Sequence, residues 1–381
     1  MRASGKVPSM RFLKGNEKTC QVQPISHSSA KKMLTSDHVT ALRPFPEFHT
    51  KTSSFASALG LAVCPSLNLL VTSSFVKDTL SVWKLPDEMV GKLSFVCFLG
   101  GAVLLGSPGR MRFDFRYRSG YLVFTPASKT TCPLLLVSDN GHATVHMIDV
   151  VKRSHVGYIA PPGSIAQPRG VAACSTLPLV AVSAWKSAHC SDNVVILYQY
   201  SARGTWEKMR VIEAGFVTNP CGLRFSRDGS SICVADCCNH RASVFHVADG
   251  GFVGHIASGL TNACDVEEVE GGWLVACFGS HTVEFVSDGP AGGGGGRFHL
   301  GKVDVHGSGD NDFLHPVVLA TVPGFGLAVF DHDGCVRMFS PPDVIAMWRN
   351  MSRYRIEWMA AVVKAAACGS SRHDKLTAWH G

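Results

Sequence analysis

The sequence predicts an all-β fold: a six-bladed β-propeller of four-stranded antiparallel blades, followed by a C-terminal amphipathic α-helix. Three observations predict it: a strand-and-turn unit at 219–256, the recurrence of this unit along the chain, and a helical period after residue 342. The 381 residues are 46% hydrophobic and 17% charged. This length accommodates one large all-β domain, and the composition supplies a large core.

The unit at 219–256 consists of four short β-type runs separated by turns. The runs read GLRFS, ICVAD, ASVFHV and FVGHI, with an Asp-Gly pair between the first two. Asp-Gly is typical of tight hairpin turns. A single sheet of four strands cannot bury both of its faces alone, so we expect copies of the unit to pack against it.

Copies of the unit recur along the chain. The second run returns as LLVTSS near Val71, LLLVSDN near Val137, LVAVSAW near Val182, ICVAD near Val234, WLVACFG near Val275 and GLAVFDH near Val329. The first run returns as ALGLAV at 58–63, PGRMRF at 108–113, PRGVAA at 168–173, PCGLRF at 220–225 and HPVVLA at 315–320. A period of about 50 residues is typical of propeller blades. We predict blades at 49–106, 107–162, 163–214, 215–258, 259–302 and 303–342.

The boundaries of the propeller follow from its ends. Pro341 and Pro342 stop the last sheet, because proline cannot continue a ladder. The sixth blade then lacks one strand, and we expect residues 37–48 to supply it, so that the propeller spans 37–342. Residues 1–36 are predicted to be a basic, disordered segment, and the glycine-rich 291–297 a flexible insertion.

The stretch NPCGLRFSRDGSSICVADCCNHRASVFHV, which begins at Asn219, resembles the NHL repeat. The likeness lies in a Pro-x-Gly before the first strand, the Asp-Gly turn, the Val-Ala-Asp strand and the Asn-His-Arg turn. It is close in 219–256 and partial in 130–160 and 168–200, whereas TLSVWKL in the first blade resembles the end of a WD repeat. The resemblance implies a six-bladed propeller that serves in binding or, in related propellers, in metal-dependent lyase or lactonase chemistry. It also implies that Arg241 pairs across blades with Asp236.

Residues 343–368 are predicted to form the amphipathic helix, with 369–381 as a tail. Asp343 is a suitable N-cap, and apolar side chains recur at spacings of three and four. The candidate contact residues on this face are Trp348, Met351, Tyr354 and Trp358. A basic amphipathic helix binds a partner groove or a membrane surface; docking on the propeller itself is the favoured alternative.

The net charge of +7 is concentrated at the two ends of the chain. Residues 1–36 carry seven basic side chains against one acidic, while the body 37–342 is nearly neutral, which argues against a broad nucleic-acid surface. One basic–aromatic ribbon interrupts the body, with Arg110, Arg112, Arg116 and Arg118 as candidate RNA or partner contacts. A strand with one apolar and one solvated face explains the same alternation and is favoured.

The fourteen cysteines predict free thiols rather than a metal framework. No C-x2-C pair occurs, and many cysteines stand singly in apolar runs. We expect a reducing, cytoplasmic location, with an organellar transit peptide as the alternative, because the first sixteen residues hold four basic and no acidic side chains. No apolar run is long enough to be a membrane span.

Histidines recur in the turn between the second and third runs, at His142, His189, His240, His281 and His332. Neutral imidazole suits zinc, so weak metal candidates are His240, His281 and His332, together with Asp265 as a channel-facing carboxylate. Turn geometry and packing between blades explain one histidine per blade equally well, and this interpretation is favoured. The rim formed by His142, His189, His240 and Arg241 is then a candidate binding surface. The acidic loop at 309–312 is a candidate Ca²⁺ site, with an exposed turn favoured.

The favoured function is a non-catalytic scaffold that binds protein through the turn-rich face of the propeller. A metal-dependent enzyme of lyase or lactonase type is the first alternative, with Zn or Ca as its cofactor; the scaffold needs none. RNA binding is the second alternative. No catalytic residue is assigned, because the sequence contains neither G-x-S-x-G nor H-E-x-x-H. The vicinal pair Cys237-Cys238 beside His240 is interpreted as a plain or redox-sensitive turn.

Overall fold

The computed structural model describes residues 50–51, 58–74, 78–85, 94–100, 113, 121–126, 132–185, 193–212, 217–269, 271–287, 297–300, 313–322, 326–332 and 335–339. The chain divides into two units, Met1–Thr35 and Ser36–Gly381, and every described residue belongs to the second. The predicted basic segment 1–36 and the tail helix 343–368 lie outside the described residues, and so does the predicted insertion 291–297 except for Arg297, which begins a strand. Within them, no helix is long and apolar enough to cross a membrane.

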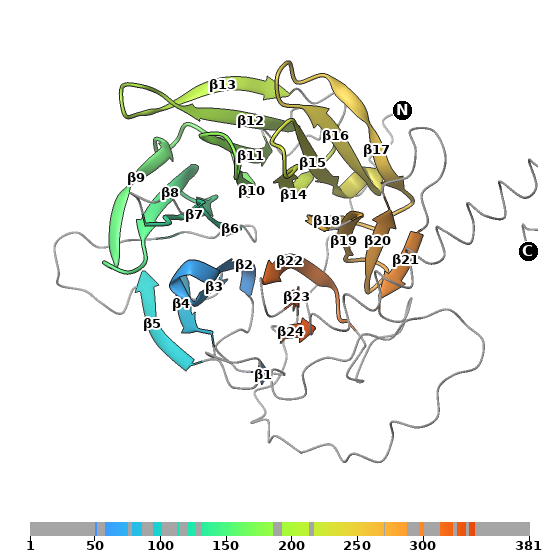
Figure 1. Ribbon diagram of the computed structural model, residues 1–381, viewed down its shortest axis with the longest axis horizontal. Coiled ribbons are helices and arrows are strands. Elements are labelled where there is room, and N and C mark those ends of the chain that lie inside the picture. The colour runs from blue at the N-terminus through green and yellow to red at the C-terminus, as the bar shows by residue number, and fades with distance from the viewer. Residues whose placement is uncertain are drawn as a thin grey trace, which may run out of the picture. The chain divides into compact units, whose positions relative to one another are not determined.

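The described residues form six four-stranded antiparallel sheets arranged around a common axis (Figure 1). Five of these sheets each contain four consecutive strands. Their strands are β2 (Ala58–Cys64), β3 (Leu69–Ser74), β4 (Thr79–Lys84) and β5 (Ser94–Gly100); β6 (Leu122–Phe124), β7 (Leu135–Asp139), β8 (Thr144–Asp149) and β9 (Ser154–Ala160); β10 (Pro168–Ala173), β11 (Leu179–Trp185), β12 (Asn193–Tyr200) and β13 (Trp206–Ile212); β14 (Pro220–Phe225), β15 (Ser231–Asp236), β16 (Arg241–His246) and β17 (Phe252–Ser258); and β18 (Ala263–Val269), β19 (Gly272–Cys277), β20 (Thr282–Ser287) and β21 (Arg297–Leu300). Two short 3₁₀ turns, η2 (Pro65–Leu67) and η5 (Cys237–Asn239), complete the order.

The sixth sheet joins the two ends of the propeller. It contains β22 (Pro316–Val322), β23 (Gly326–Asp331), β24 (Cys335–Phe339) and the short β1 (Thr50–Lys51). Thr50 lies opposite Val336, and Lys51 lies opposite Cys335. An N-terminal strand therefore pairs with the last C-terminal one, at Thr50–Lys51, whereas the predicted 37–48 lies outside the described residues.

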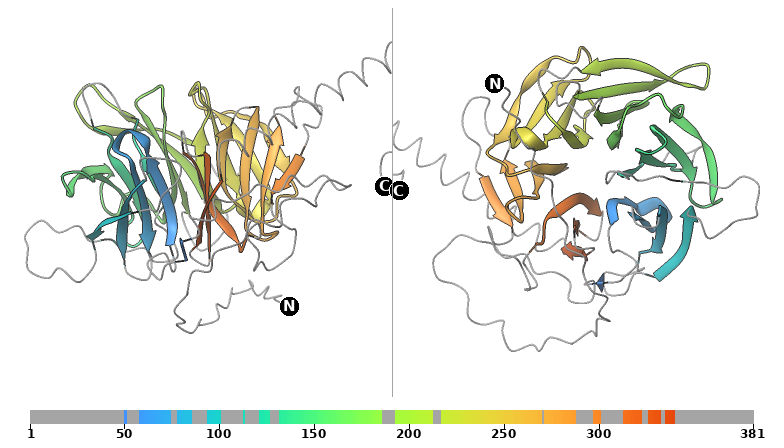
Figure 2. Two further views of the ribbon diagram at one scale, coloured as in Figure 1. Left: turned by 60° about the horizontal axis from the view of Figure 1, so that its bottom comes forward. Right: turned by 180° about the vertical axis from the view of Figure 1, so that it is seen from behind.

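The sheets close into a ring through their innermost strands. β2, β6, β10, β14, β18 and β22 contact one another in this order, and β22 returns to β2. Figure 2 shows the strands running along the axis and the same ring from behind. This arrangement of four-stranded antiparallel sheets is a β-propeller, as the sequence predicts.

The innermost strand of the second sheet is not where the sequence predicted it. The expected run was 108–113, whereas the strand that pairs with Leu135–Val137 is Leu122–Phe124. Phe113 instead packs at Gly100, where an added Cβ would meet its ring at 2.4 Å. Alternation along 108–113 indicates a strand, but pairing with β7 decides which segment is the inner one, and pairing is not a local property.

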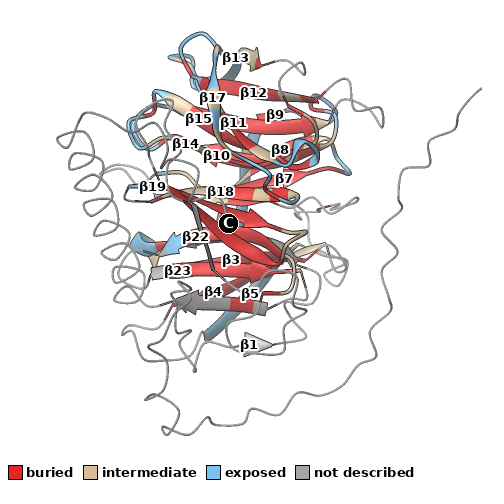
Figure 3. Ribbon diagram, turned by 90° about the vertical axis from the view of Figure 1, so that its right-hand side faces the viewer, coloured by how far each residue is buried: buried red, intermediate tan, exposed pale blue. Residues whose placement is uncertain are grey.

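The middle strands of the sheets form the core (Figure 3). All five residues of β7 are buried, and so are the last five of β15. A strand buried on both faces must also bury the polar residue at its end, and Asp139, Asp236 and Asp331 are each fully buried. Three aspartates therefore reach the same end of their sheets and require partners there.

Two glycines of the Pro-x-Gly pattern allow neighbouring sheets to approach closely. A Cβ added at Gly170 would lie 2.2 Å from the carbonyl oxygen of Cys221, and one at Gly222 would lie 1.9 Å from Asp265 Oδ1. Both glycines fall where the register of the inner strand shifts. The pattern thus marks a bulge at which the next blade touches the backbone.

Candidate functional site

Asp236 organises the turn of the fourth blade, which best matches the repeat pattern. Its Oδ1 accepts a hydrogen bond from the backbone N–H of Thr218 at 2.6 Å. Its Oδ2 accepts from Asn239 Nδ2 at 2.9 Å and from Arg241 Nε at 2.8 Å. The Asp236–Arg241 pair therefore exists, but it joins neighbouring strands of one blade and not two blades, because the two residues lie opposite each other in β15 and β16.

Two of the turn histidines, His240 and His281, link their blade to the next through a hydrogen bond. His240 has a left-handed backbone, with φ 53°, and its Nδ1 accepts a hydrogen bond from Asn262 N at 3.1 Å. His281, with φ 59°, accepts in the same way from His315 N at 3.2 Å. His332 N donates to His315 O at 3.0 Å within the sixth blade, and the His332 ring packs edge-on to Phe278 of the fifth blade at 5.7 Å. These contacts match the interpretation that the histidines pack between blades.

Asp265 lies between inner strands. It is fully buried, and its Oδ2 accepts a hydrogen bond from Leu319 N at 3.0 Å. The guanidinium of Arg224 lies 3.7 Å away. Burial raises the pKa of Asp265 to about 6, against the opposing effect of Arg224. This carboxylate joins three inner strands rather than standing alone at the channel.

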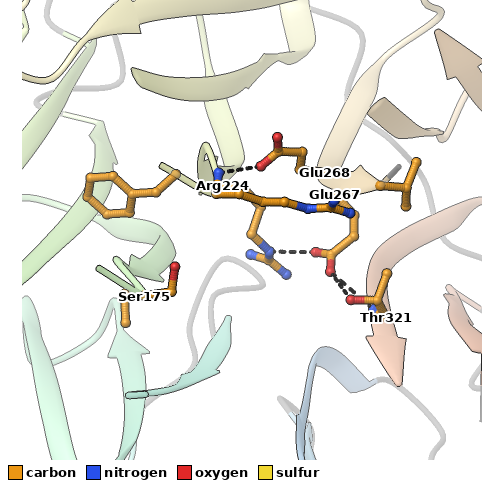
Figure 4. A pocket seen from close by; sticks show the side chains of 9 residues that line it. Ser175, Arg224, Glu267, Glu268 and Thr321 are labelled. Carbon is orange, nitrogen blue, oxygen red and sulfur yellow. Dashed lines mark hydrogen bonds and ion pairs between the residues drawn. The ribbon is translucent and has the colours of Figure 1, made fainter. Parts of the chain in front are cut away.

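A cavity of about 430 Å³ lies between the ends of β10, β14, β18 and β22 (Figure 4). Arg224 Nε donates to Glu267 Oε2 at 2.8 Å, and Thr321 Oγ1 donates to Glu267 Oε1 at 2.6 Å. Glu268 accepts from the backbone N–H of Arg227. The cavity is on the face opposite the histidine turns, because it lies where the inner strands end. The sequence pattern indicated apolar inner positions such as Leu223 and the single carboxylate Asp265, but not Arg224 or Glu267, although successive residues of a strand face opposite sides.

A second cluster of polar side chains surrounds Asp139 in the second blade. Asp139 Oδ1 accepts a hydrogen bond from His142 N at 3.0 Å. Asp139 Oδ2 lies 2.9 Å from His142 Nδ1 and 3.0 Å from His146 Nε2. His146 Nδ1 lies 3.3 Å from His155 Nε2. The oxygen and the two imidazole nitrogens that face it lie within 4.8 Å of one another.

The imidazoles of this cluster differ in exposure. The side chain of His142 is 43% exposed and that of His146 only 6%. Burial lowers the pKa of His155, and the neighbouring His146 lowers it further. The turn pattern in the sequence predicts His142 but not His146 and His155, since both of these lie on strands and not in the turn. The spacing Asp-x2-His-x3-His at 139–146 was the available signal.

Four thiols gather where the fourth blade meets the fifth. The Cys237 thiol shares hydrogen bonds with the thiols of Cys221, Cys238 and Cys264, which raise its pKa. Asn219 Nδ2 donates to Cys238 Sγ at 3.2 Å. The pKa of the Cys238 thiol is lowered to about 6 by Cys237, then by Asn219 and His240. The ten cysteines whose side chains the structure describes are all free.

The outermost strand of the first blade, β5, carries exposed apolar side chains. Phe95, Val96 and Phe98 are 47%, 43% and 48% exposed. The rings of Phe95 and Phe98 lie 4.6 Å apart, and Phe95 also contacts Trp83 edge-to-face at 5.3 Å. These rings form one continuous apolar surface, which we call the β5 patch (Phe95, Val96 and Phe98).

Several predicted site residues lie outside the described residues. They are Arg110, Arg112, Arg116 and Arg118 of the basic–aromatic ribbon, His189 of the rim, the loop 309–312, and Trp348, Met351, Tyr354 and Trp358 of the tail. Their roles therefore remain predictions.

Comparison with known proteins gives a likeness among the solved structures and none among family models or curated proteins. No protein-family model matches the sequence, and no curated protein matches it either. A solved structure described as a nidogen/laminin complex contains a chain that is similar, at 13% identity and a TM-score of 0.49. The match covers 68% of this chain and 82% of that chain. The assignment as a β-propeller rests on the six sheets themselves.

Proposed function

We propose that this chain is a non-catalytic binding scaffold that holds a protein partner against the β5 patch. The exposed apolar edge of the first blade carries this proposal. β5 is the last strand in its sheet, after β2, β3 and β4. A cluster of exposed apolar side chains on an outer strand is typical of an interaction surface.

The kind of partner follows from the strand geometry. An edge strand offers backbone N–H and C=O groups to an extended peptide, while pockets between its side chains select alternate residues of the ligand. Phe95 and Phe98 provide large, rigid contact area of the kind enriched at interfaces. The partner is therefore an extended segment with apolar residues at every second position.

The local architecture supports a propeller of the NHL kind with six blades. The Asp236–Asn239–Arg241 contacts and the close approach at Gly222 give structural roles to three parts of the repeat pattern. A composite last sheet, built from both ends of the propeller, supports the six-blade count. The predicted turn-rich face then serves mainly to link the blades, and the outer edge serves to bind.

The proposal is tested by selecting peptides from a displayed random library on the immobilised full chain. We expect enriched peptides with alternating apolar residues that lose at least tenfold in affinity for Phe95→Asp/Phe98→Asp. A matched control is Tyr200→Asp/Met209→Asp, which changes two exposed apolar residues on the third blade's outer strands. Peptides that bind both double variants equally, or no enrichment at all, would overturn the proposal.

A further inference from the structure

In the second and fourth blades, the charges of aspartates at equivalent positions are neutralised by different side chains. Asp236 lies opposite Arg241 in β15 and β16, and Asp139 lies opposite Thr144 in β7 and β8. The hydroxyl of Thr144 donates to Ala160 O at 2.5 Å. The ion pairs of Asp139 are with His142 and His146, whose charge depends on protonation. A fixed guanidinium is thus replaced by two titratable imidazoles around a fully buried carboxylate.

These three side chains have the chemistry of a transition-metal site. One carboxylate and two imidazoles form a donor set suited to Zn²⁺ and related borderline ions, whereas Ca²⁺ prefers oxygen ligands alone. Asp139 Oδ2, His142 Nδ1 and His146 Nε2 already converge within 4.8 Å. An ion between them replaces the hydrogen-bonding protons, and the lone pairs freed on the two nitrogens become ligands.

The surroundings hold these ligands in position. The backbone N–H of His142 fixes Asp139 Oδ1 and leaves Oδ2 directed at the imidazoles. His155 Nε2 contacts the far nitrogen of His146 at 3.3 Å, and the Phe113 ring packs edge-on to the same imidazole at 5.3 Å. A partner on the second ring nitrogen fixes the tautomer and orientation of a ligating histidine.

Exposure differs across the cluster. Asp139 and His146 are buried, whereas His142 lies in the turn with 43% of its side chain exposed. Because His142 is the exposed member, solvent reaches the cluster from its side. We propose that Asp139, His142 and His146 bind a divalent transition-metal ion of the Zn²⁺ class, with water as the further ligand. This site is independent of the β5 patch.

The test is a Co²⁺ titration of the purified, chelator-treated full chain, followed by the visible absorption of the bound ion. We expect one Co²⁺ per chain, displaced by Zn²⁺, and a spectrum without thiolate-to-cobalt charge transfer. The key variant is His142→Asn, because the fourth blade has Asn239 at the equivalent position and there keeps the hydrogen bond to aspartate. We expect its affinity for Co²⁺ to fall at least about 100-fold with the fold intact.

A matched control changes another turn histidine. His240→Asn keeps a residue that tolerates the left-handed backbone and leaves the cluster around Asp139 untouched, so Co²⁺ binding stays as in the wild type. His155→Gln, which alters only the residue behind His146, is expected to lower the affinity by about 10- to 100-fold. Three results would each overturn the proposal: no Co²⁺ bound, wild-type affinity in His142→Asn, or a thiolate band that assigns the ion to the cysteines.

Discussion

The second and fourth blades share a backbone and differ in chemistry. Between the second and third strands, the fourth blade reads Asp-Cys-Cys-Asn-His-Arg at 236–241, and the second reads Asp-Asn-Gly-His-Ala-Thr at 139–144. The residue before the third strand is left-handed in both, with φ 53° at His240 and φ 54° at Ala143. The repeat therefore determines where the aspartate lies, and the residues after it determine what neutralises its charge.

The largest effect is expected from breaking the guanidinium pair in the fourth blade. Arg241→Ala leaves the buried Asp236 without its cation, and the free energy of unfolding should fall by about 3 kcal/mol. This is the lower end of the usual range, because the Arg241 side chain is 26% exposed. Urea unfolding measures the loss.

A pair of a buried aspartate with an exposed lysine in the second blade is the control for this variant. Lys152 lies 3.2 Å from Asp149 with a side chain that is 79% exposed, so Lys152→Ala should cost less than about 1 kcal/mol. Because Asp149 is buried like Asp236, equal losses in the two variants would contradict the view that the exposure of the cation sets the size of the loss.

The buried carboxylate of Asp265 is held in a third way, and we expect it to make the stability of the fold depend on pH. Its pKa is raised from 3.8 to about 6 by burial, so the folded state keeps a proton that the unfolded state releases. The contribution of this group to stability is therefore lost as pH rises from about 4 to 6. Asp265→Asn should remove about 2–3 kcal/mol of this pH dependence. Denaturant unfolding at pH 4 and 7 checks it; parallel profiles of variant and wild type would show that Asp265 titrates normally.

The turn positions that carry Cys238 in one blade and Gly141 in the other predict a difference in reactivity. The pKa of Cys238 is lowered to about 6, so its thiolate predominates at neutral pH. Mass spectrometry of partially alkylated protein should show Cys238 as the fastest of the described cysteines, with a rate that levels off above pH 7. Asn219→Ala removes a hydrogen-bond donor to the Cys238 sulfur and should raise the pH at which the alkylation rate is half of its maximum, the midpoint of the profile. A midpoint above pH 8 in the wild type would refute the prediction.

The smallest effect is expected from giving the fourth blade the second blade's histidine. Asn239 donates to Asp236, and His142 makes the equivalent contact to Asp139 in the second blade, so Asn239→His should keep a contact to the aspartate and change stability by no more than about 0.5 kcal/mol. It should also add no second Co²⁺ site, because Arg241 already occupies Asp236. Calorimetric titration counts the ions bound. A gain of one ion per chain would mean that the histidine alone, and not the missing arginine, makes the second blade a metal site.

The local sequence predicted those strands of the fold that are determined by residues close to them in the chain. The four runs at 219–256 correspond to β14–β17, because tight turns and short apolar runs determine adjacent antiparallel strands. The resemblance to the repeat predicted an Asp236–Arg241 pair across blades, but the register of β15 and β16 shows that the pair lies within one blade. The inner strand of the second blade was misplaced, since its identity depends on pairing with β7.

What the sequence by itself determined is the propeller class and the periodic turn residues, since these depend on hydrophobic period and backbone conformation. The tertiary structure alone decided which side chains converge. Arg224 meets Glu267 from 43 residues away, and Tyr121 reaches Cys264 O from 143 residues away. His155 likewise contacts His146 from the next strand of its sheet. Such contacts arise from ring closure and strand register, which bring distant residues together without leaving a pattern in the nearby sequence.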